Sequence, residues 1–329
     1  MSRTQDMRGS TTGKDGVFKS SYDHIFENSF KTILIALLFP VFLFAFLFIA
    51  VFLFASTMSD GNTLKLTIEL MTGISPVFAL CVIGWMAIAY WTGPRMLLKS
   101  ARALPITKEE NPQIYRLVEN LCISTGIPLP KIYIMNDDSL NAFATGRNPK
   151  SASIALTTGI IKKLEKSELE GVIAHELAHI KNRDIRLMVL IIAVIGFSAF
   201  AAELLIRMGF RSKKGGFPII IAGLLFLAFS IFIAPLIRMA VSRRREYQAD
   251  ATAVLITRNP EALAGALEKI SHDSRVESLD SRPSMALMCI ENPLEGTKKT
   301  LASRFWGLWA THPPIADRVL ALRSMNFGL

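Results

Sequence analysis

The sequence predicts an α+β fold: a mainly helical integral membrane protein, in which four apolar helices are combined with a polar domain that contains a small sheet. The first indication is composition, because 51% of the 329 residues are hydrophobic and the mean hydropathy is positive, which is high for a soluble domain. The second is the presence of four long apolar runs. The third is a polar segment between the second and third runs, where helical and strand-like patterns alternate.

A first membrane hairpin is expected within residues 31–94, after a polar tail at residues 1–30. Residues 32–55 carry no charge and exceed the roughly 20 residues that cross a hydrocarbon core. Residues 70–94 are also free of charge, and three aromatic residues lie toward one end, as they do at membrane interfaces.

A second membrane hairpin is expected at residues 187–237. Its first half, 187–202, is short for a span, so a buried or interfacial helix is the alternative. Glu203 and Arg207 follow and are expected to reach the outer interface. Its second half, 215–237, is free of charge.

The net charge of +10 is carried largely by basic residues beside the apolar runs. That placement favours a lipid surface over nucleic acid as the partner. Lys65 is the only basic residue between the first two runs, whereas several precede the first run and follow the second. For a multi-pass protein of this kind, the positive-inside rule therefore places the N-terminus and the region after residue 95 in the cytoplasm.

The first part of the polar domain is expected at residues 95–186. Residues 113–127 have helical periodicity and end in glycine and proline signals. Strands are expected at 131–137, 140–146 and 151–159. A long loop is expected later in the chain, at 271–304.

A metal-site motif follows these strands. Ser167 and Glu170 are spaced as a capping box and predict the start of a helix. That helix carries His175, Glu176 and His179 in the pattern HExxH, where positions four apart share a face and can bind one ion. Zinc would lower the pKa of a bound water toward about 7, and the adjacent carboxylate would take its proton. The alternative is that the two histidines have no metal-binding role. It is disfavoured because the apolar neighbours predict a buried helix, and burying the two histidines and the glutamate without a metal ion would cost free energy.

The second part of the polar domain, residues 238–329, supplies a candidate third ligand in the stretch SRRREYQAD. Glu246 and Asp250 are four apart, hence on one face of a helix. Glu246 is expected to bind the metal, and Asp250 to orient a metal-binding histidine. A solvated glutamate is the alternative for Glu246, and Glu261 and Glu268 are rival ligands.

Both halves of the predicted site lie close to apolar runs. His179 precedes Leu187 by eight residues, and Glu246 follows Ile237 by nine. As helical extensions these separations correspond to about 12–14 Å beyond the apolar boundary. The ligands are therefore expected in water, just outside the bilayer.

Over residues 30–329 the chain resembles the HtpX family of membrane zinc metalloproteases, relatives of the CAAX prenyl proteases. The resemblance rests on HELAHIKNRD, SRRREYQAD, NAFATGR and THPPIADRV. It implies a zincin-like (gluzincin) catalytic domain facing the cytoplasm, with one zinc ion per chain bound by His175, His179 and Glu246, and Glu176 as the general base. It also implies a multi-pass protein of the cytoplasmic (inner) membrane, self-cleavage, and the cleavage of misfolded or damaged membrane proteins in quality control. CAAX proteases have more membrane spans, so prenylated substrates are not expected.

Two further motifs gain candidate roles from this resemblance. An extended substrate is expected to pair with an edge strand beside the cleft, formed by Asn141, Ala142, Phe143 and Ala144. Asn141 could also hold a substrate carbonyl, and an ordinary interior strand is the alternative.

The second motif is THPPIADRV. His312 and Arg318 match a histidine and an arginine that line the cleft in related enzymes, and either could stabilise an oxyanion. The alternative is a turn made by the two prolines that happens to carry His312.

Three function classes can be compared with these features. An endopeptidase leads; the alternative is a non-catalytic, zinc-containing membrane adaptor or chaperone-like protein. A structural zinc site needs no base and fills all four positions with protein ligands, so Glu176 argues against the adaptor. A transporter is disfavoured because the apolar runs show no pair of discontinuous helices. The three cysteines form no CxxC pair, and no feature defines a specificity pocket or an oligomeric state.

Overall fold

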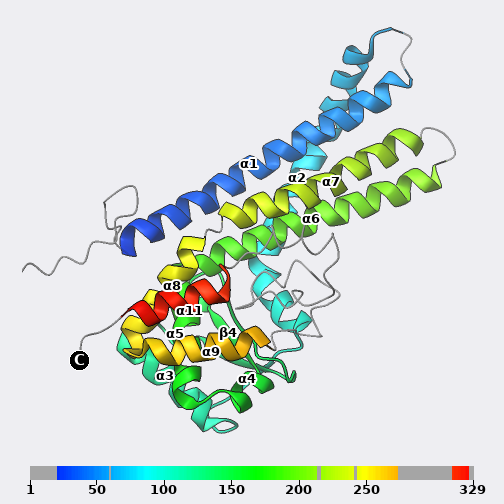
Figure 1. Ribbon diagram of the computed structural model, residues 1–329. Helices are drawn as coiled ribbons and strands as arrows, with labels where there is room; N and C mark the ends of the chain where they lie inside the picture. Colours follow the sequence, from blue (N-terminus) through cyan, green and yellow to red (C-terminus); the bar gives the residue numbers. More distant parts are fainter. Residues whose placement is uncertain (1–20, 59–60, 213–215, 241–242, 273–312, 326–329) are drawn as a thin grey trace, which may run out of the picture.

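Four long helices leave one side of a mixed domain and run beside one another (Figure 1). The computed structural model describes residues 21–58, 61–212, 216–240, 243–272 and 313–325. The predicted loop from residue 273 onward and His312 lie outside these ranges. The long helices are α1 (Ser21–Ser56), α2 (Thr63–Ser100), α6 (Asp184–Arg211) and α7 (Gly216–Ala240).

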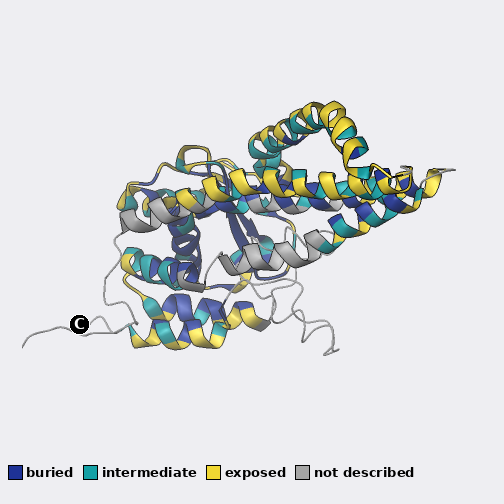
Figure 2. Ribbon diagram, turned by 90° about the horizontal axis from the view of Figure 1, so that it is seen from above, coloured by how far each residue is buried: buried dark blue, intermediate teal, exposed yellow. Residues whose placement is uncertain are grey.

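The first hairpin consists of α1 and α2. Ile33–Ser56 and the whole of α2 are long and apolar enough to cross a membrane. Their large apolar side chains are widely exposed, and exposed residues line the long helices in Figure 2. Apolar exposure on this scale indicates a surface that contacts a membrane or another protein rather than water. The start differs from the prediction: α1 begins at Ser21, inside the expected polar tail, because the helix continues beyond its apolar part.

The second helix is also longer than the predicted run at 70–94, since it extends to Ser100. Its last turns are held by tertiary packing: Leu97 and Leu98 are buried in one cluster with Phe143 of the sheet. The end of α2 therefore belongs to the domain, not to the apolar hairpin.

A second hairpin is formed by α6 and α7, which pack closely against one another. A Cβ on Gly223 of α7 would lie 2.6 Å from the Ile206 Cγ1 atom and 3.0 Å from its backbone nitrogen, so the approach requires glycine. The third run, predicted at 187–202, is part of a longer helix, and its exposed Glu203 and Arg207 form an ion pair.

Four short strands form one sheet in the order β1-β2-β4-β3. The strands are β1 (Leu104–Pro105), β2 (Lys131–Met135), β3 (Ala142–Thr145) and β4 (Ser153–Thr157). Only β2 and β4 are parallel. Among the described residues β3 lies at an edge. The three predicted strands are present, whereas β1 escaped prediction because two residues, one of them a proline, show no alternation.

Shorter helices complete the domain: α3 (Pro112–Thr125), α4 (Thr158–Lys163), α5 (Lys166–Lys181), α8 (Arg243–Thr257), α9 (Pro260–His272), α11 (Ile315–Ser324) and the 3₁₀ turn η1 (Pro149–Ser151). Among them α5 packs beside the sheet, and α8 and α9 pack on α5. The predicted helix at 113–127 is α3, and Gly126 ends it in the left-handed conformation (φ 68°).

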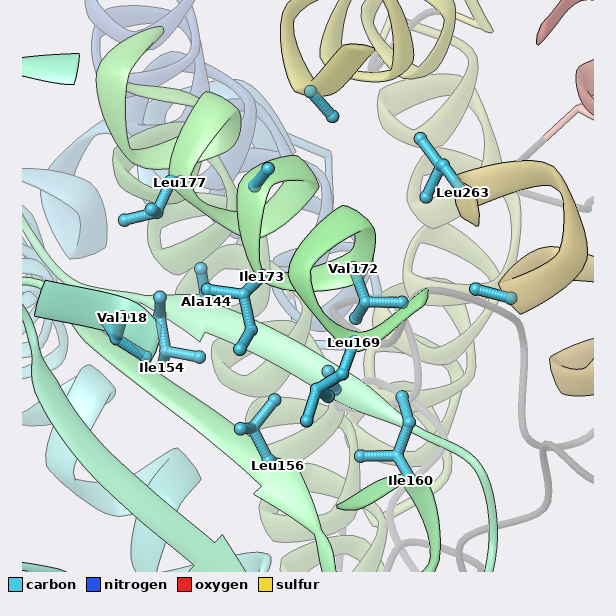
Figure 3. Packing of buried hydrophobic residues seen from close by; sticks show 14 of the residues in the cluster. Val118, Ala144, Ile154, Leu156, Ile160, Leu169, Val172, Ile173, Leu177 and Leu263 are labelled. Carbon is cyan, nitrogen blue, oxygen red and sulfur yellow. The ribbon is translucent and has the colours of Figure 1, made fainter. Parts of the chain in front are cut away.

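The central helix of the domain is α5, which packs between β4 and α9. Figure 3 shows Ile173 above Ile154, with Val172 directed toward Leu263. A Cβ on Gly171 would lie 3.2 Å from the Leu263 Cα atom, so α9 approaches α5 very closely there. The helix that carries the metal motif is therefore fixed by packing on several sides.

Candidate metal centre

The start of α5 is fixed by a buried carboxylate. The predicted N-cap, Ser167, lies inside the helix, which begins at Lys166. Instead, the Glu168 side chain accepts a hydrogen bond from the Glu165 backbone N–H at 2.8 Å and pairs with Lys269 of α9 at 2.7 Å. The capping box is thus formed two residues earlier than predicted, because Glu168 is held from both α5 and α9.

A tight turn separates α5 from α6. Asn182 ends α5, Arg183 takes a left-handed conformation (φ 60°), and α6 begins at Asp184. Because the chain changes direction here, α5 is not an extension of the apolar helix, and the separation expected for His179 from a continuous helix was wrong. The Asp184 carboxylate instead accepts a hydrogen bond from Nδ1 of His179 at 2.8 Å. The first turn of α6 therefore touches the metal motif.

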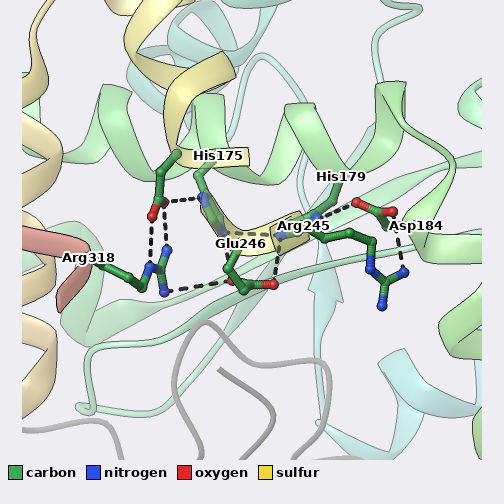
Figure 4. Close-up of polar contacts among 7 residues, drawn as sticks. His175, His179, Asp184, Arg245, Glu246 and Arg318 are labelled. Atoms are coloured by element: carbon green, nitrogen blue, oxygen red, sulfur yellow. Dashed lines mark hydrogen bonds and ion pairs between the residues drawn. The ribbon is translucent and has the colours of Figure 1, made fainter. Parts of the chain in front are cut away.

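The other histidine meets a carboxylate from α8. Oδ1 of Asp250 lies 2.9 Å from Nδ1 of His175. The same carboxylate accepts hydrogen bonds from Nε and Nη2 of Arg318 at 2.8 and 2.7 Å (Figure 4). Each imidazole thus turns its Nδ1 atom toward a carboxylate, which leaves both Nε2 atoms for a ligand.

These two Nε2 atoms converge with the Glu246 carboxylate (Figure 4). The Nε2 atoms of His175 and His179 are 3.1 Å apart, and each lies 3.6 Å from one Glu246 oxygen. Atoms bonded to zinc at about 2.0–2.1 Å in a tetrahedron lie about 3.3 Å from one another. The separation of the two imidazole nitrogens is close to that value. The carboxylate faces both imidazoles, with Oε2 near His175 and Oε1 near His179. One ligand atom from each of the three side chains lies within 4.8 Å of the others, so together they can hold one ion.

The charge around this point also fits a divalent cation. Four carboxylates, of Glu176, Asp184, Glu246 and Asp250, are at most 4% exposed. Two guanidinium groups are buried with them, from Arg245 and Arg318. With neutral histidines, four negative and two positive charges leave a net charge of −2 among the described residues. Buried net charge is strongly unfavourable, and one doubly charged ion would neutralise it.

The same excess of buried carboxylates raises the pKa values of the two histidines. Burial alone would lower the pKa of His175, but the Asp250 and Glu246 carboxylates raise it to about 9. The pKa of His179 is also raised, because Glu246 and Asp184 outweigh burial. Burial alone would raise the pKa of Asp250, yet the Arg318 guanidinium lowers it to about 2. A metal ion would compete with protons for a site that attracts either.

Arg318 is placed differently from the expectation of an oxyanion-binding residue at the cleft surface. Its side chain is fully buried and committed to Asp250, and Nη1 lies 3.7 Å from Glu246. Burial opposes charge, but the nearby carboxylates of Asp250, Glu246 and Glu176 raise the pKa of Arg318. This geometry fits a residue that positions the site through Asp250.

The predicted substrate strand lies where a partner strand could join the sheet. Asn141 directly precedes β3, which packs beside α5. All four residues are buried: Asn141, Ala142, Phe143 and Ala144. Oδ1 of Asn141 accepts a hydrogen bond from the Ala142 N–H at 2.9 Å. This burial covers whole residues, backbone and side chains alike, so the expected pairing with a substrate rests on the edge position of β3 alone.

Two residues of the site were not predicted from the sequence. Asp184 orients His179, and Nη1 of Arg245 lies 3.4 Å from the other Asp184 oxygen. Both belong to the quoted motifs, since Asp184 ends HELAHIKNRD and Arg245 precedes the ligand Glu246. Their roles depend on the turn at Arg183, which spacing alone does not reveal.

Comparison with known proteins matches residues 108–326 to the Peptidase family M48. The chain is 39% identical over 313 residues to a "Protease HtpX homolog" of Bacteroides fragilis (strain YCH46), covering 91% of this chain and 96% of the relative. It is 36% identical over 318 residues to a "Protease HtpX homolog" of Thermoanaerobacter pseudethanolicus, covering 94% and 99%.

Among solved structures, S. mikatae Ste24p aligns with a TM-score of 0.42 and 20% identity, over 89% of this chain and 66% of that one. This structural likeness is too low to support an argument. The family match and the two relatives are sufficient, because they cover most of the chain. The chain therefore belongs to peptidase family M48, among its HtpX-type members.

Proposed function

We propose that this chain is a membrane-anchored zinc metalloendopeptidase that binds one zinc ion. The observation that carries the proposal is the convergence of His175, His179 and Glu246 on one buried point, with Glu176 next to the first ligand on the same helix. Two imidazoles and one carboxylate are a known ligand set of catalytic zinc, with a fourth position open.

Zinc, when bound, would act as a Lewis acid and lower the pKa of a coordinated water toward about 7. Glu176 is the proposed general base: its carboxylate accepts a proton and then delivers it to the departing amine. Asp250 and Asp184 hold the histidine tautomers that leave Nε2 available. His312 remains the proposed oxyanion contact and lies outside the described residues.

The proposed substrates are extended peptide segments of misfolded or damaged membrane proteins. A strand that adds to the edge of the sheet at β3 would be bound through backbone hydrogen bonds, which every sequence offers. This mode of binding supports broad sequence preference, as quality control requires.

The proposed location is the cytoplasmic membrane, with four spans and the site on the cytoplasmic side. Two candidate spans come from α1 and α2, and α6 and α7 are proposed to cross as a second hairpin. The basic residues that flank the apolar runs support this orientation. The turn between α5 and α6 then holds the metal centre close to the bilayer surface.

A non-catalytic zinc-containing adaptor is the competing function. It would need the ligand set but no general base, so it gives no reason for a carboxylate next to the first ligand at Glu176.

Exchange of Glu176 for Gln separates the two functions. The E176Q chain, purified in detergent, should bind one equivalent of zinc but lose cleavage of a denatured membrane-protein substrate, whereas E246A should lose both. Metal analysis and gel-based cleavage measure these outcomes. Undiminished cleavage by E176Q would contradict the catalytic proposal, and so would absence of zinc from the wild-type chain after purification with added zinc.

A further inference from the structure

A cluster of two aromatic and two basic residues lies where three elements meet. Tyr90 and Trp91 come from α2, Arg147 from the connection between β3 and η1, and Arg186 from the first turn of α6. The Arg147 guanidinium carbon lies 3.9 Å from the Trp91 ring centroid and 5.8 Å from that of Tyr90. The Arg186 guanidinium carbon lies 5.9 Å from the Tyr90 ring. We call these four residues the interfacial cluster.

The cluster lies at the expected depth of the bilayer surface. Residues 70–90 of α2 form an apolar stretch of about 20 residues, which spans about 30 Å as a helix. The level of Tyr90 on α2 is therefore the edge of the hydrocarbon core. Trp91 is 62% exposed and faces outward at this level. The contact between Arg186 and Tyr90 brings α6 to the same depth.

Positive charge at this level is not balanced by nearby acidic residues. The sequence holds no acidic residue between Glu69 and Glu109, while Arg95 and Lys99 extend the basic character along α2. Within the described ranges, neither Arg147 nor Arg186 forms an ion pair with a carboxylate. The Nε atom of Arg186 is buried without a hydrogen-bond acceptor. Stacking on the rings thus leaves both guanidinium groups with unused charge and donors.

We propose that the interfacial cluster binds the headgroup of an anionic phospholipid. The chemistry is complementary: two guanidinium groups offer paired N–H donors to a phosphodiester, and the two rings occupy the depth of the acyl boundary. The inference rests on the proposed membrane placement of α2 and α6, but not on the proteolytic chemistry.

The location links such a lipid to the metal centre. Arg186 lies two residues after Asp184, which orients His179, and Arg147 lies two residues after Thr145, where β3 ends. A bound headgroup would therefore fix both the metal motif and the edge strand at one height above the bilayer.

The test compares lipid retention by native mass spectrometry. Wild-type and R147Q/R186Q chains, purified in zwitterionic detergent, are titrated with phosphatidylglycerol and phosphatidylcholine. The matched control is R116Q/K131Q, which removes two positive charges from exposed positions on α3 and β2. Zinc content reports whether each variant is folded.

Wild type should retain phosphatidylglycerol in preference to phosphatidylcholine. Because a basic residue near an anionic surface contributes about fivefold in affinity, R147Q/R186Q should lose about 30-fold for phosphatidylglycerol alone. The control should keep the wild-type preference. If the double variant loses zinc, the single variants R147Q and R186Q are used, each with an expected loss of about fivefold.

Equal retention of both lipids by the wild type would overturn the proposal, as would an equal loss in the control. Displacement of the lipid by soluble glycerol phosphate at similar concentration would also overturn it, because the site would then recognise a free phosphate. The E176Q chain should retain the lipid like the wild type. If the zinc-loaded wild type prefers phosphatidylglycerol but cleaves no substrate, the proposed function is refuted and the lipid site stands.

Discussion

Replacement of Arg318 by methionine should destabilise the domain strongly. The guanidinium is fully buried and donates two hydrogen bonds to Asp250, itself 1% exposed. Methionine keeps much of the apolar length but removes the charge, so among the described residues Asp250 is left with His175 as its partner. Removing one member of a buried ion pair destabilises by about 3–5 kcal/mol, a large part of the about 5–15 kcal/mol of a typical domain.

This loss should depend on pH in a defined direction. In the folded wild type the pKa of Asp250 is lowered from 3.8 to about 2. Its ion pair therefore contributes fully above pH 3.8 and is lost as the pH falls toward about 2. The difference in stability between wild type and R318M should be large at pH 7 and should shrink in that acid range.

Thermal unfolding of the zinc-free chain in detergent measures the effect, and chelator competition measures zinc affinity. R323M is the matched control, because Arg323 lies on the same helix but forms exposed ion pairs with Glu261 and Glu268, which contribute little. Equal unfolding temperatures of R318M and R323M would refute the reasoning. A variant with unchanged stability and zinc affinity but reduced kcat would instead favour the oxyanion role predicted from the sequence.

Three further outcomes are expected. D184A should lower zinc affinity about 10–100-fold, because His179 loses the carboxylate that orients it; chelator competition that gives the wild-type value would contradict this. A proton on His175, with a pKa of about 9, competes with zinc, and so does one on His179, whose pKa is also raised. The apparent wild-type affinity should therefore rise at least about tenfold per pH unit from pH 6 and level off near the pKa of His175; an affinity independent of pH would argue against it. Burial raises the pKa of the Cys122 thiol to about 11. With the other two cysteines replaced by serine, maleimide at pH 8 should therefore label the chain only after denaturation. Rapid labelling of the folded chain would show that the thiol is accessible.

The metal set could be predicted because its geometry is local. On a helix, a separation of four residues alone aligns His175 with His179, and Glu246 with Asp250. The prediction that the two pairs meet rests on the third protein ligand that a catalytic zinc requires, and the resemblance supports it; the structure brings the pairs together. The role of Arg318 could not be predicted from spacing. The motif places an arginine near the site, but it does not show whether the side chain is buried or lines the cleft.

Other differences arise from tertiary contacts. Glu168 caps α5 because Lys269 of α9 reaches it, 101 residues away in the chain. The end of α2 remains helical because it packs on the sheet, and β1 exists because β2 offers it a partner. In each case a long-range contact prevails over a local signal.

The left-handed turn at Arg183 limits how far from the lipid a scissile bond can be. Because Asp184 touches His179 and Arg186 lies level with Tyr90, the catalytic point stands about one helical turn, roughly 5 Å, above the hydrocarbon edge if α6 crosses the bilayer. An extended peptide advances about 3.3 Å per residue. A stub of only two or three residues emerging from the membrane would then be long enough to be cut, without prior extraction of its anchor.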